Sequence, residues 1–120
     1  MKTIVSLAFC VCANALMTPV VAAQGMDEVE IEVVELRESV YMLFGRGGNL
    51  GLVVTEDGAF LIDDQYAPLT ERIAAAVATV TDQSIRFVLN THWHGDHTGG
   101  NAYIVQRTNA QVYIPVDDRV

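Results

Sequence analysis

Cysteine and lysine are nearly absent from this sequence of 120 residues, and both absences restrict what the chain can be. The two cysteines, Cys10 and Cys12, lie in its first apolar stretch, so the remainder contains no disulfide and no thiolate metal ligand. Lys2 is the single lysine. After residue 23, six arginines stand against fifteen acidic residues, a net charge of −9. Such an acidic surface argues against nucleic acid or an anionic membrane as the partner.

The apolar start of the chain has the composition of a secretory signal. A basic Met1–Thr3 precedes an apolar core, and Val21-Ala22-Ala23 is a small-residue cleavage pattern. We expect residues 1–23 to be removed as a signal peptide and residues 24–120 to form the mature domain, exported to the periplasm or secreted. The alternative is an uncleaved membrane anchor, because the apolar run nearly reaches spanning length. After cleavage, no membrane association is expected.

Short apolar runs punctuated by turn residues predict a single α/β domain without repeats. Acids alternate with Val or Ile at 29–36, which is typical of a half-exposed edge strand, and Asp57-Gly58 indicates a hairpin. A helix beginning near Pro68 would place Leu69, Ile73 and Val77 on one face, together with Val80. The run at 85–89 is typical of a strand buried on both sides. We predict further strands at 40–44, 50–54, 59–62 and 111–114, and a short helix at 101–107.

All three histidines of the sequence lie within six positions of the run Thr91–Asn101, beside an aspartate. His92 and His94 are two residues apart, so in an extended segment both side chains point to the same side and can bind one ion. Asp96 and His97 are adjacent, which suits a second ion or the orientation of what the first one binds. Imidazole and carboxylate ligands suit zinc, although iron and manganese accept them too.

Three neighbouring features remain open to two interpretations each. Residues 45–48, Gly-Arg-Gly-Gly, form either a plain hairpin loop, which loop statistics favour, or a mobile flap over the site. Asp63 ends a predicted strand on the side of the site, as either a partner of a ligand imidazole or a turn residue before the helix. Strand alternation points Trp93 away from His92 and His94, towards packing or substrate contact.

The run His92-x-His94-x-Asp96-His97 resembles the signature of the metallo-β-lactamase superfamily. Its flanks, Asn90-Thr91 and Thr98–Asn101, are similar too, and the resemblance continues upstream through 49–54 and 57–63. The resemblance covers about two-thirds of the chain, and the pattern of residues is closest to that of the exported, cyclase-like hydrolases of the superfamily.

The resemblance implies a role for each residue of the motif. His92 and His94 would bind a first zinc, and Asp96 and His97 a second; Asp96 would also orient the attacking water as the catalytic residue. Asp63 would lie near the metals. The implied enzyme is a di-zinc hydrolase in which metal-activated water attacks the carbonyl of an ester, thioester, lactone or β-lactam.

The implied fold is a four-layer αββα sandwich, of which this chain would supply only the first half. The superfamily completes its metal sites with later ligands, but no histidine or cysteine follows His97. We therefore expect an amino-terminal fragment that is inactive alone. Alternatives are a β-lactamase proper, a mononuclear iron oxidoreductase resembling the persulfide dioxygenases, and a metal-binding module without turnover. The partner would be a small-molecule substrate; the sequence leaves the oligomeric state open.

Overall fold

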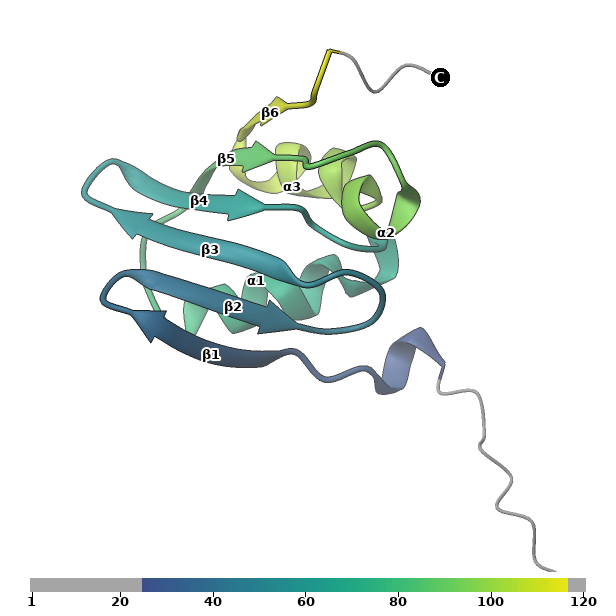
Figure 1. Ribbon diagram of the computed structural model, residues 1–120, viewed down its shortest axis with the longest axis horizontal. Helices are drawn as coiled ribbons and strands as arrows, with labels where there is room; N and C mark the ends of the chain where they lie inside the picture. The colour runs from purple at the N-terminus through teal and green to yellow at the C-terminus, as the bar shows by residue number, and fades with distance from the viewer. Residues whose placement is uncertain (1–24, 117–120) are drawn as a thin grey trace, which may run out of the picture.

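The computed structural model describes residues 25–116, and within them a six-stranded sheet carries helices on one face (Figure 1). The expected signal peptide, Cys10 and Cys12 lie outside these residues. The strands follow one another across the sheet in chain order: β1 (Glu32–Arg37), β2 (Val40–Phe44), β3 (Leu50–Thr55), β4 (Gly58–Ile62), β5 (Ile85–Leu89) and β6 (Gln111–Tyr113). The helical elements are η1 (Met26–Glu28), η2 (Ala67–Leu69), α1 (Thr70–Ala78), α2 (Gly95–Thr98) and α3 (Asn101–Thr108). No helix within the described part of the chain has the length and apolar content needed to cross a bilayer.

Strands β1 to β4 pair antiparallel through short hairpins, whereas β4–β5 and β5–β6 pair parallel. The β3–β4 hairpin pairs Thr55 with Gly58, whose φ of 127° requires glycine, so the turn predicted from Asp57-Gly58 is confirmed. Parallel strands need a crossover, and η2 with α1 makes it between β4 and β5. The carboxyl ends of β4 and β5 consequently meet at one edge of the sheet.

The hydrophobic core lies between the sheet and its helix layer. Leu52, Leu61 and Val88 occupy one face of three adjacent strands and are fully buried. Leu69 and Ile73 meet them from the crossover, because their spacing places them on one helix face. The helical pattern predicted from the sequence is therefore confirmed, with α1 beginning two residues after Pro68.

The opposite sheet face is apolar and partly exposed. Phe60 and Phe87 stack there with ring centroids 4.5 Å apart, and Tyr113 lies 6.3 Å beyond Phe87. The prediction that the strand at 85–89 is buried on both sides is wrong for this chain: Leu89 is 39% exposed. Within the described residues, helices cover one face of the sheet only.

The predicted edge strand at 29–36 begins later than its alternating pattern suggests. Residues 26–28 form η1, and Arg72 of α1 donates hydrogen bonds to the backbone carbonyls of Met26 and Asp27. These bonds attach the segment to the crossover helix, so sheet pairing starts at Glu32. The strand is at the sheet edge, as expected, with its acids exposed.

Candidate metal centre

The histidine run begins where β5 ends, and Asp63 follows the end of the neighbouring strand β4. Because β4 and β5 are parallel, both segments emerge at the same edge of the sheet, next to α2 (Figure 1). Ligands of open α/β sheets bind beyond the carboxyl ends of strands, which is this location. The fold therefore brings together two sequence segments that are about 30 residues apart.

The three imidazole rings gather at this edge. The ring of His92 lies between the others, with its centroid 4.7 Å from that of His94 and 3.9 Å from that of His97. The prediction that Trp93 points away from its neighbours is wrong, because its ring lies 4.7 Å from the ring of His94. Residues 91–93 form a bend instead of a strand, so strand alternation does not apply there. Trp93 is nevertheless 57% exposed at the rim of the site.

Asp63 is the acceptor that holds the run in place. Its Oδ1 accepts the Thr91 backbone N–H at 2.7 Å, and its Oδ2 accepts the Thr91 hydroxyl at 2.7 Å. Oδ2 also lies 2.8 Å from His97 Nδ1. A buried carboxylate with three donors is well satisfied, which is why Asp63 tolerates both its burial and a φ of 61°. The structure supports the first of the two interpretations of Asp63, because its carboxylate is the hydrogen-bond partner of an imidazole.

These hydrogen bonds determine which ring nitrogen of His92 and of His97 is left free to bind a metal. The hydroxyl of Thr91 has one hydrogen, which goes to Asp63, so the oxygen must accept from His92 Nδ1, 3.0 Å away. His97 donates from Nδ1 to Asp63 by the same reasoning. Both imidazoles therefore keep the lone pair on Nε2, the atom that remains for a metal.

One metal-binding atom of Asp96 and one of His97 are separated by the distance expected for two ligands of the same ion. Asp96 Oδ2 lies 3.4 Å from His97 Nε2, which is long for a hydrogen bond. Two ligands each about 2.0–2.1 Å from a tetrahedral zinc ion are separated by about 3.4 Å. The nitrogen and oxygen donors, and their spacing, therefore fit zinc.

Across residues 25–116, no three His, Cys, Asp or Glu side chains are arranged so that together they hold one ion. The donors of the run occur as the pair Asp96–His97 and the neighbouring rings of His92 and His94. Each pair is smaller than the three or four ligands that zinc takes in proteins. Further ligands are needed to complete either site.

Asp64, next to Asp63, is fully buried behind the run. Its Oδ1 accepts the Gly100 N–H at 2.9 Å, and its Oδ2 has no hydrogen-bond partner among the described residues. Burial raises the pKa of Asp64 to about 7; the negative charge of Asp63 adds to this rise, and the hydrogen bond from Gly100 opposes it.

Two residues that the sequence did not single out hold the backbone of the site. Asn90 donates from Nδ2 to the His97 carbonyl at 2.9 Å, and Asn101 donates to Asn90 Oδ1 at 2.8 Å. In the sequence, both asparagines were visible only as flanks of the motif. Thr91 was likewise visible only as a flank of the motif.

Residues 45–49 form the hairpin loop between β2 and β3, as loop statistics favoured, and this loop also packs against the site. A Cβ built on Gly47 would lie 2.9 Å from Asp96 Cβ, and one on Gly48 would lie 2.5 Å from His97 Cε1. Only backbone without a side chain fits so close to the two residues. The loop is thus a wall of the candidate centre.

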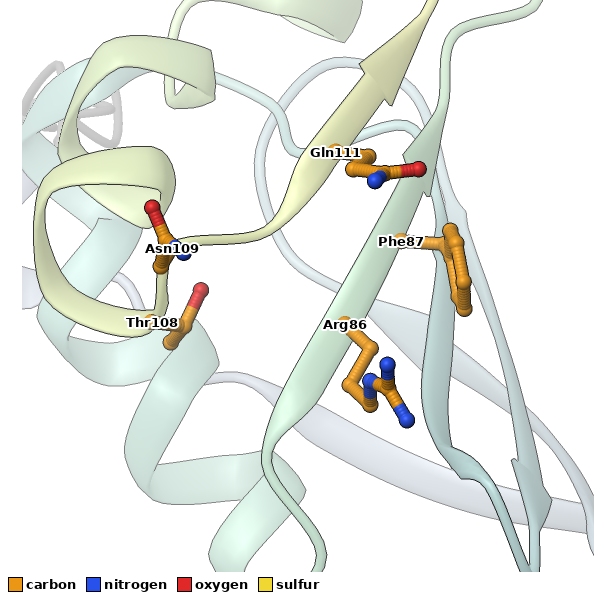
Figure 2. Close-up of a pocket in the computed structure, with 5 residues that line it drawn as sticks. All are labelled: Arg86, Phe87, Thr108, Asn109 and Gln111. Carbon is orange, nitrogen blue, oxygen red and sulfur yellow. The ribbon is translucent and has the colours of Figure 1, made fainter.

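A polar depression of about 230 Å³ lies elsewhere, near the start of β5. It is lined by Arg86, Phe87, Thr108, Asn109 and Gln111, which come from β5, β6 and the end of α3 (Figure 2). The histidine run follows the other end of β5, and the depression shares no residue with it. Its polar groups are partly used internally, since Arg86 donates to the Asp57 carbonyl and Tyr113 to Gln111.

The sheet with its single helix layer, and the histidine run beyond the strand ends, define an α/β protein with a candidate metal centre. The family model described as metallo-beta-lactamase superfamily matches residues 43–120. The chain belongs to this superfamily, and it supplies one sheet and its helix layer of the metallo-β-lactamase fold.

Among solved structures, the chain is similar to BJP-1, a subclass B3 metallo-β-lactamase of Bradyrhizobium japonicum. The identity is 32% and the TM-score 0.62, over 69% of this chain and 32% of that one. MEM-A1, a subclass B3 enzyme isolated from a soil metagenome library, gives 26% identity and a TM-score of 0.63, over 69% and 32% of the two chains.

Among curated proteins, the chain is similar to a hydroxyacylglutathione hydrolase of Polaromonas sp., with 40% identity over 56% of this chain and 24% of the relative. It is also similar to the lactamase-like protein aptB of Emericella nidulans, with 46% identity over 46% of this chain and 18% of the relative. The chain thus spans a quarter or less of these curated relatives and about a third of the solved ones.

Proposed function

We propose that the protein is an exported, zinc-dependent hydrolase acting on a small molecule with a carbonyl-centred bond, such as an ester, thioester, lactone or β-lactam. The observation that carries the proposal is the pairing of Asp96 Oδ2 with His97 Nε2 at 3.4 Å, beside two further imidazoles. The similar proteins include a hydroxyacylglutathione hydrolase and metallo-β-lactamases, and these names support the proposal.

In this proposal His92 and His94 hold one zinc ion, and Asp96 and His97 hold a second. Bound zinc supplies a water of lowered pKa and neutralises charge that develops on the substrate. The residues of this chain do the remaining work. Asp63 fixes His97 directly and His92 through Thr91, so that both rings present Nε2.

Asp96 is the proposed catalytic residue. Its side chain is 31% exposed, so it reaches the open side of the site while one oxygen faces His97. An ionised carboxylate there accepts a hydrogen bond from the attacking water and directs the water's lone pair towards the carbonyl carbon. Trp93, exposed at the rim, offers an apolar surface to the substrate.

Export and the substrate class rest on different support. The signal-like residues 1–23 support export, and the acidic composition supports a protein without nucleic acid or membrane partners. The family and the names of the relatives support the proposed substrate class.

The test uses the full-length protein purified from the exported fraction. We expect about two zinc ions per molecule and turnover of at least one ester, thioester, lactone or β-lactam, with His92→Ala reducing both. Asp82→Asn, at an exposed turn far from the motif, is the matched control. One iron and no zinc would replace this proposal with a mononuclear iron oxidoreductase. Zinc binding with background turnover on the whole panel would leave a binding module.

A further inference from the structure

The loop at residues 45–49 is tied down by a buried glutamine. Gln65 has no exposed surface and a φ of 55°. Its side-chain Oε1 accepts the Arg46 backbone N–H at 3.3 Å, and its Nε2 donates to the Gly48 carbonyl. The amide therefore satisfies a donor on one side of Gly47 and an acceptor on the other. Glutamine is long enough to reach the loop, and its amide has both the acceptor and the donor that the two hydrogen bonds need.

Close packing around the amide supports the same conclusion. A Cβ built on Gly45 would overlap Gln65 Oε1, so the strand end passes directly over the amide. Gly47 adopts a φ of 93°, which permits the sharp turn between the two hydrogen bonds. The loop is thus closed around Gln65, and residues 45–47 are exposed on its outer side.

Gln65 is also attached to the far end of the histidine run. Its backbone carbonyl accepts the Gly100 N–H at 3.1 Å, three residues after His97. Gly99 lies so close that a Cβ there would be 2.8 Å from the same carbonyl oxygen. One residue therefore connects the β2–β3 loop, through its side chain, with the segment that follows the metal motif, through its backbone.

We infer that Gln65 is a positioning residue, which holds the loop as a fixed wall and thereby keeps His97 and Asp96 oriented for zinc. The loop transmits this effect by contact: Gly48 packs on the His97 ring and Gly47 on Asp96. The inference rests on the proposed zinc site. With Gln65 in this role, the loop is a fixed hairpin loop and not a mobile flap over the site.

Trypsin reports the state of the loop without any metal. Arg46 is the arginine of the loop, and cleavage after it requires the loop to open. In the full-length protein, Gln65→Met keeps the side-chain length but removes both hydrogen bonds. We expect cleavage after Arg46 to accelerate about tenfold, with little change after Arg72 or Arg107. Gln83→Met, at an exposed turn, is the matched control and should behave as wild type.

Zinc affinity, measured by competition with a chelator, reports the positioning role. Gln65→Met should bind zinc about tenfold more weakly than wild type and Gln83→Met equally well. Should Gln65→Met fail to fold, Gly45→Ala tests the same contact from the exposed side of the loop, with the same two changes expected.

The outcomes separate the two ideas. Unchanged cleavage after Arg46 in both variants overturns the inference while the hydrolase proposal stands. Faster cleavage with unchanged zinc affinity overturns the positioning role. A wild-type protein that binds no zinc overturns the proposed function, and the positioning role with it.

Discussion

Asp63 Oδ2 lies 2.8 Å from His97 Nδ1, and the same oxygen accepts the hydroxyl of Thr91. Together with Oδ1, which accepts the Thr91 N–H, the carboxylate serves three donors. A single buried acid therefore orients two imidazoles of the candidate centre. The following variants test what that arrangement does.

Asp63→Asn should weaken zinc binding about 10- to 100-fold. Asparagine accepts the positive φ of this position, but its amide has one acceptor oxygen for three donors. His97 would lose the partner that fixes its free nitrogen. Chelator competition measures the change, with Asp82→Asn as the exposed control. An affinity equal to that of wild type would show that the carboxylate does not orient the ligands.

Thr91→Val removes the hydroxyl that links Asp63 to His92 while keeping the shape of the side chain. The tautomer of His92 would no longer be fixed, so we expect zinc affinity to fall about tenfold. Thr91→Ser retains the hydroxyl and should restore most of the affinity. Equal losses in the valine and serine variants would mean that packing, and not the hydrogen-bond relay, matters at this position.

Gly48→Ala should disturb His97 more than a substitution inside the motif disturbs it. The new Cβ would lie 2.5 Å from His97 Cε1, so the ring or the loop must move, and we expect about a tenfold loss of zinc affinity. Gly95→Ala is the comparison, because a Cβ there meets nothing within 4 Å. Isothermal titration with zinc measures both. A larger effect at Gly95 than at Gly48 would contradict the loop contact.

Asp64 should make the stability of the protein depend on pH. Its pKa is about 7 in the folded state and near 3.8 when exposed, so the folded state binds more protons between these values. Its contribution is therefore complete below about pH 4 and is lost as the pH rises towards 7, by at most about 1.4 kcal/mol per pH unit.

Asp64→Asn removes this dependence and keeps the acceptor for the Gly100 N–H. Urea unfolding in the presence of EDTA should show the variant gaining stability over wild type between pH 5 and pH 8. A constant difference between the two proteins over that range would show that Asp64 does not titrate there.

Local patterns in the sequence predicted the elements well and the contacts around the site poorly. The strands 40–44 and 85–89 have the predicted bounds, because apolar runs and turn residues are local signals. Gln65 could not be found that way: its partners Arg46 and Gly48 are 19 and 17 residues away, and its positive φ leaves no mark in the sequence. The late start of β1 depends on Arg72, which is equally remote.

The motif itself was visible because four ligand-type residues are close together in the sequence. Whether His92, His94, Asp96 and His97 bind metal stays a prediction, since the described residues hold them as pairs. The role of Thr91 needed the structure, because it depends on where one hydroxyl hydrogen points.

The parallel pairing of β4 with β5 makes the contact between Asp63 and His97 a long-range one. Asp63 and His97 are separated by 34 residues, and only the completed crossover brings them within reach of each other. In the unfolded chain, the imidazoles adopt either tautomer, and no carboxylate orients them for an ion. In the proposed zinc protein, the ion would therefore bind after the crossover has formed, and a peptide of the histidine run alone is expected to bind zinc weakly.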